Sequence, residues 1–323
     1  MKRFLLRIAL LAALCLGVLL ALSRLYLVFV GTGYLRDLDE TYKFESVPYE
    51  IEYAGFGSSH SGASFRPDAF AGSGHTAFSF YMSAQSPVMD AELYRLYRDH
   101  LAENAVVTLT ISPMSLYSDP TGEMTHMKRY CNALPLRALP TLKTKLYRLF
   151  RVVDFRVDDI FEYFRTRSIT DFSAAKAADI LAGRLGSSDK SNVDWSEWGA
   201  ELAAIHKSSF VQDPSEGPVP RVAEAIDGML ADCVARGYRV ALYTPPFTSY
   251  FWDNFSAEFQ AQMRKDTAEI AARYGIPYFD YSEDPRFCQN MDYFEDVDHM
   301  SLEGSKALVP VLLADIDAFY DEK

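Results

Sequence analysis

Two short segments, far apart along the chain, carry residue types that together can activate a serine. Residues 57–60 read Gly-Ser-Ser-His and follow the mostly apolar segment 51–56, whereas residues 296–299 read Asp-Val-Asp-His. A serine hydroxyl is a poor nucleophile at neutral pH. It needs a neutral imidazole to accept its proton and a carboxylate to hold the tautomer of that imidazole. Each segment alone is a weak signal, but the pair predicts a serine hydrolase or acyltransferase.

Two carboxylates compete to orient His299. Asp296 lies three residues earlier and can reach the ring if the loop turns back on itself just ahead of a helix. Asp298 is the immediate neighbour of the histidine, and a side chain in that position more often points away. We therefore favour Asp296 as the orienting carboxylate and keep Asp298 as the alternative.

These segments resemble two sequence blocks of the SGNH (GDSL-like) hydrolases. Residues 57–60 look like the first block and residues 296–299 look like the last, a DxxH block. The resemblance covers roughly residues 48–120 and 236–320. It implies Ser59 as the nucleophile, His299 as the general base and Asp296 as its partner.

The same resemblance implies an oxyanion hole with three donors. In the family these are a backbone N–H of the nucleophile, another from a Gly in a second block, and an Asn side chain in a third. Residues 83–86, Ser-Ala-Gln-Ser, are similar to the second block with Ala84 in place of Gly. The third block should follow residues 105–111, but no Asn occurs there, so Ser112 or Gln85 would have to substitute. Loss of one donor costs about 10²–10³ in rate, so the alternatives are a slow enzyme or a site that binds without turnover.

The remaining histidines and cysteines give weaker signals. His60 follows the proposed nucleophile and either touches substrate or is a packed or solvated side chain. The four histidines without a partner pattern, expected at the surface, are His75, His100, His126 and His206. We expect neither a metal nor a cofactor, because the chain has no CxxC or HExxH pair. Three cysteines lie outside the N-terminal apolar run, Cys131, Cys233 and Cys288, which allows one disulfide but no dense framework.

Apolar strand-like runs alternate with helical stretches through most of the chain. This alternation predicts a mainly parallel sheet with helices on both faces, a three-layer α/β/α sandwich. The expected strands are 51–57, 76–82, 105–111, 239–244 and 278–281, and the expected helices are 90–103, 256–274 and 302–320. Ser59, Asp296 and His299 would then lie in loops at the carboxyl edge of the sheet, where open α/β sheets bind ligands.

An insertion of about residues 117–220 interrupts this alternation. It is mostly helical by pattern, with apolar positions three or four residues apart over 142–153, 157–165 and 173–185. Up to about residue 190 it is rich in Arg and Lys, unlike the acidic remainder. It is either a basic lid that guides an anionic polymer or lies on lipid headgroups, or a solvated amphipathic cap.

The N-terminus has the pattern of a membrane anchor. Lys2 and Arg3 precede an apolar run from Phe4 to about Leu22, and a second apolar piece continues to Val30. About 20 apolar residues span a bilayer as a helix, and the basic residues favour a cytoplasmic N-terminus. We expect an anchor at 1–30 and an SGNH-like domain at 31–323 on the outer side; the alternative is a cleaved signal peptide. The net charge of −12 argues against nucleic acid as a partner.

The closer likeness is to the membrane-anchored branch that includes teichoic-acid D-alanyl transfer proteins and alginate acetylation proteins. This resemblance implies an acyl-Ser59 intermediate and a cell-envelope polysaccharide, acylated glycan or teichoic-type polymer as substrate. It also implies a membrane-bound O-acyltransferase as partner. The alternative is a non-catalytic envelope protein with this fold that binds polymer or assembles with such a partner.

Overall fold

The computed structural model describes residues 2–30, 42–122, 133–139, 142–149 and 194–322. The chain divides into two compact units. One contains Met1–Ser46 with Met127–Ser187, and the other contains Val47–His126 with Ser188–Lys323. All of the residues predicted to do chemistry lie in the second unit.

A parallel five-stranded sheet forms the centre of the second unit, with strand order β2-β1-β3-β4-β5. The inner part of the sheet is apolar along its length, as expected where helices cover both faces. Every residue of β3 from Ala105 onward is buried, and so is every residue of β4 after the first. The strands are β1 (Ile51–Phe56), β2 (Ala77–Ser79), β3 (Leu101–Thr110), β4 (Arg239–Thr244) and β5 (Tyr278–Asp280).

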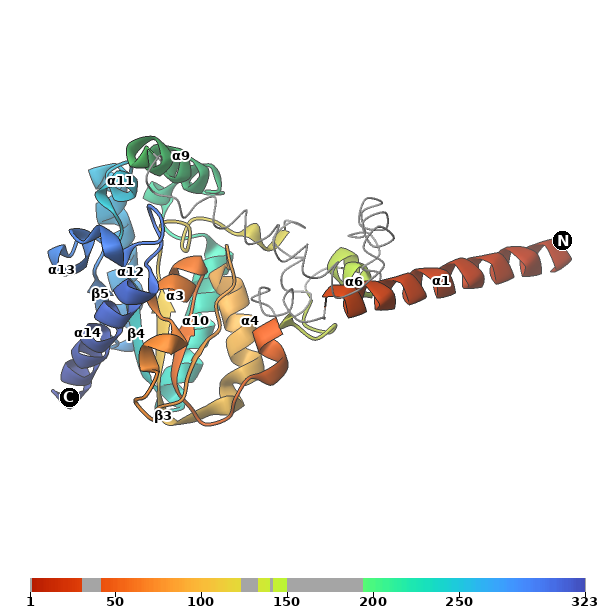
Figure 1. Cartoon of the computed structure of the whole chain (residues 1–323), viewed down its shortest axis with the longest axis horizontal. Helices are drawn as coiled ribbons and strands as arrows, with labels where there is room; N and C mark the ends of the chain where they lie inside the picture. Colours follow the sequence, from red (N-terminus) through yellow and green to blue (C-terminus); the bar gives the residue numbers. More distant parts are fainter. Residues whose placement is uncertain (1, 31–41, 123–132, 140–141, 150–193, 323) are drawn as a thin grey trace. The chain divides into compact units, whose positions relative to one another are not determined.

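Helices cover both faces of this sheet, and the strand side chains alternate between them. On one face Val106, Ala241 and Tyr243 belong to a core that includes Leu308 and Leu312 of helix α14. On the other face α4 packs beside α10 (Figure 1). The bounds of these helices are α4 (Pro87–Tyr97), α10 (Pro220–Ala235) and α14 (Leu302–Asp321), and α12 (Ala257–Tyr274) contacts α10 and β4. The predicted three-layer α/β/α architecture with a parallel sheet is confirmed.

The predicted helix at 90–103 was wrong at both ends. Ser86 caps α4 by accepting a hydrogen bond from the Val88 N–H, and Pro87 occupies the first turn, where proline is favoured. The helix stops at Tyr97 because β3 already begins at Leu101, which pairs with Ile51 of β1. The helices predicted at 256–274 and 302–320 match α12 and α14 to within one residue at each end.

Outside the sandwich, three helices bear on the sequence predictions. Helix α1 (Lys2–Val30) contains one segment, Lys2–Leu22, that is long and apolar enough to cross a membrane. Helix α6 (Leu142–Leu149) lies within the first predicted insertion helix, 142–153, whose last four residues are outside the described ones. The helices predicted at 157–165 and 173–185 lie outside the described residues. The predicted boundaries of anchor, domain and insertion stay predictions.

Helix α9 (Trp195–Ser208) was not predicted, although it lies within the expected insertion. It packs closely on the short helix α11 (Ser249–Trp252). The close approach needs Gly199, because a Cβ there would lie 1.9 Å from the Tyr250 carbonyl oxygen. Among the described cysteines Cys15, Cys233 and Cys288 are free thiols, and Cys131 lies outside the described residues.

Candidate active site

A sharp turn at the end of β1 presents Ser59. Gly57 has φ +136, a backbone conformation that favours glycine, and a Cβ there would lie 3.0 Å from the Cβ atoms of Ser61 and Thr110. The chain then enters the short helix α3 (Ser59–Ser64), of which Ser59 is the first residue. The serine is therefore held at the carboxyl edge of the sheet, as predicted, with its side chain partly exposed.

The loop before α14 turns back on itself and presents His299. One oxygen of Asp296 accepts hydrogen bonds from the backbone N–H groups of Asp298 and His299, at 3.0 and 2.7 Å. The backbone N–H of Glu295 donates to the His299 carbonyl at 2.9 Å, which closes the loop. Ser301 then caps α14 by accepting from the Gly304 N–H. Asp296 thus shapes the loop as well as facing the imidazole.

Ser59, His299 and Asp296 form a continuous hydrogen-bonded chain. The Ser59 hydroxyl lies 2.8 Å from His299 Nε2, and His299 Nδ1 lies 3.0 Å from each oxygen of Asp296. With Nδ1–H donating to the carboxylate, Nε2 is left to accept the serine proton. The His299 and Asp296 side chains are 23% and 25% exposed, so a solute can reach this edge of the site.

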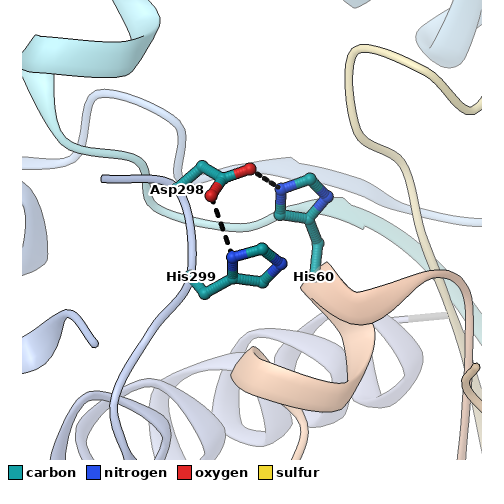
Figure 2. A group of neighbouring side chains, drawn as sticks. All are labelled: His60, Asp298 and His299. Carbon is teal, nitrogen blue, oxygen red and sulfur yellow. Dashed lines mark hydrogen bonds and ion pairs between the residues drawn. The ribbon is translucent and has the colours of Figure 1, made fainter. Parts of the chain in front are cut away.

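Asp298 also contacts His299, so the two candidate carboxylates do not exclude each other. Its side chain is fully buried, and Oδ1 lies 2.8 Å from His299 Nδ1 (Figure 2). That contact is an ion pair without hydrogen-bond alignment, because Oδ1 has no aligned donor. The other oxygen, Oδ2, accepts from His60 Nε2 at 2.9 Å. Asp298 therefore bridges two imidazoles.

The charges of this group shift the pKa values of its members. Burial alone would lower the pKa of His299, but the Asp298 charge and the hydrogen bond to Asp296 raise that pKa well above 6.5. Burial alone would raise the pKa of Asp298, but His299 and His60 hold it well below 3.8. Both shifts favour the carboxylate–imidazolium pair, which is the charge state that His299 reaches when it takes a proton.

His60 and His206 are both packed into this group. His60 is 3% exposed, so of the alternatives considered it is the packed side chain, and its ring stacks on that of His299 at 4.8 Å with an interplanar angle of 13°. The prediction that His206 lies at the surface was wrong. It is 6% exposed, its Nε2 lies 3.5 Å from Asp298 Oδ2, and burial lowers its pKa to about 4. The spacing of Gly199, Ala203 and His206 on one face of α9 is the signal that could have shown this burial.

His60, Asp298 and His299 have the residue types of a metal site, and their ligand atoms lie within 4.8 Å of one another. A bound ion lies in the plane of each ligating ring, about 2.0–2.1 Å from the nitrogen if the ion is zinc. The two rings are stacked and nearly parallel, so their planes do not converge on one such point. The arrangement fits a carboxylate that bridges two imidazoles better than it fits an ion.

The three predicted oxyanion donors are in different situations. Ala84 has φ +54, a left-handed backbone conformation that favours glycine. The Gln85 side chain was a poor prediction, because its amide donates to the Phe80 carbonyl and to Asp90. Ser112 is buried just beyond β3. Its backbone N–H donates to the Ser115 hydroxyl oxygen at 2.9 Å, and its own hydroxyl oxygen lies 3.1 Å from the same atom.

Asp90 links the turn at Gly57 to the side chain of Gln85, and no sequence pattern predicted this contact. Its Oδ1 accepts from the Gly57 backbone N–H at 2.8 Å and from the Gln85 amide. The side chain is 1% exposed, and burial raises its pKa to about 7. An Asp in the first turn of a helix is common for electrostatic reasons alone, so no local pattern distinguished it.

The comparisons with known proteins add a weak structural likeness. No family model and no curated protein matches the chain. Among solved structures, one similar chain is described as a "putative acylhydrolase" from Bacteroides fragilis NCTC 9343. It has a TM-score of 0.41 and 13% identity, and the alignment covers 88% of this chain and 97% of that one. At that TM-score the fold assignment depends on this chain's own sheet and helices.

Proposed function

We propose that this protein is a serine esterase or O-acyltransferase that works through an acyl-Ser59 intermediate. The observation that carries the proposal is the continuous contact from Ser59 Oγ to His299 Nε2, at 2.8 Å, and from His299 Nδ1 to the Asp296 carboxylate, at 3.0 Å. Both contacts are within the range for proton transfer and orientation. Three residues from the two ends of the domain meet in the order that nucleophilic catalysis requires.

The reaction follows from these contacts. His299 Nε2 takes the proton of Ser59 as Oγ attacks the ester carbonyl, and Asp296 and Asp298 stabilise the imidazolium. Backbone N–H groups of Ser59 and Ala84 are the proposed donors to the oxyanion. When the tetrahedral intermediate collapses, the ester C–O bond breaks and His299 returns the proton to the leaving alcohol. Water or an acceptor hydroxyl, deprotonated by His299, then attacks the acyl-serine and releases Ser59.

The cellular setting is part of the same proposal. Helix α1 anchors the chain in the membrane, with Lys2, Arg3 and Arg7 on the cytoplasmic side and the α/β domain on the outer side. The length and apolar character of Lys2–Leu22 support the anchor. The substrate is a cell-envelope polysaccharide or teichoic-type polymer, and a membrane-bound O-acyltransferase supplies the acyl group. These last two statements follow from the sequence resemblance.

A fluorophosphonate probe tests the nucleophile directly. The full-length chain in detergent is exposed to the probe, and intact-mass spectrometry counts the adducts. We expect one adduct in the wild type and none in Ser59→Ala or His299→Ala. Ser61→Ala is the matched control, because Ser61 lies in the same helix and is buried, and this variant should label like the wild type.

Nitrophenol release from p-nitrophenyl acetate distinguishes hydrolysis from transfer. Steady release means that water reaches the acyl-serine and the protein is an esterase. A single burst with a persistent acetyl adduct means that the intermediate waits for an acceptor. A folded wild-type chain that neither labels nor releases nitrophenol would refute the proposal and favour the non-catalytic, polymer-binding alternative.

A further inference from the structure

The carboxylate of Asp298 bridges the edges of two stacked imidazoles in a place without solvent. Its side chain is 0% exposed. Oδ2 accepts from His60 Nε2 at 2.9 Å, and Oδ1 lies 2.8 Å from His299 Nδ1 (Figure 2). A buried charge is costly unless hydrogen bonds and opposite charge compensate for it. The negative charge of Asp298 must therefore be balanced chiefly by His60 and His299, the two closest of the three imidazoles around it.

The other polar groups around His299 do not supply that balance. Asp296 is a second negative group on the same loop, and Ser59 is neutral. His206, on α9, has its pKa lowered to about 4 by burial, so it is uncharged at neutral pH. The Arg66 guanidinium faces the Met300 carbonyl and pairs with Glu295 at 2.7 Å. The hydrogen bond from His60 is thus the main contact, besides the one with His299, that stabilises the Asp298 carboxylate.

We propose that Asp298 is a second orienting carboxylate for His299 and that His60 moderates it, so that both act as positioning residues behind Ser59. This inference rests on the proposed function. Asp298 favours the imidazolium that forms during the reaction. The hydrogen bond from His60 stabilises part of the negative charge on Asp298 and so weakens the effect of that charge on His299. His299 can then also be neutral, as a general base must be before the reaction starts.

Asp298 and His60 change the pKa of His299 in opposite directions. Asp298→Asn removes a negative charge near His299, which lowers the pKa of the imidazole and moves the acidic limb of the rate profile to lower pH. Loss of the His60 donor leaves Asp298 less compensated, which raises the same pKa and moves the limb to higher pH. Purely structural damage would lower the rate at every pH alike.

Gln and Asn make a matched pair at position 60. The side-chain amide of Gln extends to the place of Nε2 and can still donate to Asp298. The amide of Asn reaches only the place of Nδ1, which lies 3.4 Å from the Ser58 hydroxyl. His60→Gln should therefore keep the wild-type profile, whereas His60→Asn should lose the hydrogen bond to Asp298.

The experiment measures the second-order rate constant of fluorophosphonate labelling of Ser59 in the full-length chain, by intact mass, from about pH 5 to pH 9.5. We expect the acidic limb to move down by about 1 pH unit or more in Asp298→Asn, the usual effect of one nearby charge. It should move up by roughly 0.5 in His60→Asn and stay within about 0.2 in His60→Gln, as expected for loss or retention of one hydrogen bond.

The outcomes separate this inference from the proposed function. A wild type that does not label at Ser59 refutes the function. If the wild type labels but Asp298→Asn and His60→Asn move the limb in the same direction, or only scale the rate, this inference is wrong and the function stands. If His60→Asn does not fold, NMR titration of the His299 imidazole in Asp298→Asn and in the wild type decides, and equal pKa values overturn the inference. If Asp298→Asn does not fold, the same titration in His60→Asn and His60→Gln decides, and equal pKa values in these two variants overturn it.

Discussion

The buried carboxyl of Asp90 makes the stability of this protein depend on pH in a defined direction. Burial raises its pKa from 3.8 to about 7, although hydrogen bonds from Gln85 and from the Gly57 N–H oppose the rise. The folded chain therefore holds this proton more tightly than the unfolded chain does. The resulting stabilisation is complete below about pH 3.8 and is lost as the pH rises through about 7.

The size of the effect follows from the same values. A pKa difference of one unit is worth about 1.4 kcal/mol, so the rise from 3.8 to about 7 removes about 4 kcal/mol of unfolding free energy between low pH and pH 8. In Asp90→Asn the side chain keeps an oxygen that can accept the hydrogen bond from the Gly57 N–H, but it can no longer ionise. We expect this variant to be more stable than the wild type at pH 8, by up to about 4 kcal/mol, and within about 1 kcal/mol of it at pH 4.

Urea unfolding of the full-length chain in detergent, followed by tryptophan fluorescence at pH 4, 6 and 8, measures this difference. Asp68→Asn is the control, because Asp68 is an exposed carboxyl in a helical turn, and it should show no comparable gain at high pH. Fluorophosphonate labelling of Asp90→Asn should stay within about threefold of the wild type, since the acceptor for Gly57 is retained. A variant that is equally destabilised at all three pH values would refute the reasoning, because Asp90 would then be needed as an anion.

Three further predictions concern single positions. Burial lowers the pKa of His206 to about 4 from 6.5, so protonation of the unfolded chain should remove up to about 3 kcal/mol of stability between pH 7 and pH 4. His206→Gln should flatten that dependence in urea unfolding, and an unchanged slope would contradict the assignment. Gly199→Ala should lower the melting temperature sharply, because its Cβ would lie 1.9 Å from the Tyr250 carbonyl oxygen. Gly228→Ala is the control: a Cβ added at this position in α10 meets no neighbouring atom within 4 Å, so this change should stabilise the chain by about 0.5–1 kcal/mol. Equal melting temperatures would show that α9 does not pack as described. Ala84→Gly should relieve about 1 kcal/mol of backbone strain at φ +54 and leave the labelling rate unchanged, and a large loss of rate would show that the Ala84 methyl group is needed.

Local pattern was enough to predict where the five strands lie and to name the residues of the proposed site, although β3 already begins at Leu101 and β2 covers only Ala77–Ser79. The core segments of β1, β3 and β4 are apolar because both faces of a parallel sheet are covered, and that requirement is visible in each segment alone. Ser59 and His299 could be predicted because each lies just beyond or just before a regular element, and Asp296 because its three-residue spacing lets it reach the histidine in a turned loop.

Only the tertiary structure decided which further groups surround the imidazole. Asp298 bridges His60 and His299, and His206 reaches the same carboxylate from α9, because helices distant along the chain pack against one loop. Asp90 reaches Gly57 across the α4 side of the sheet for the same reason. Burial and contact between distant residues depend on the whole packed core, so no local spacing encodes them. The residues of the proposed site can therefore be named from the sequence, whereas their burial and the shifts of their pKa values are set by the fold.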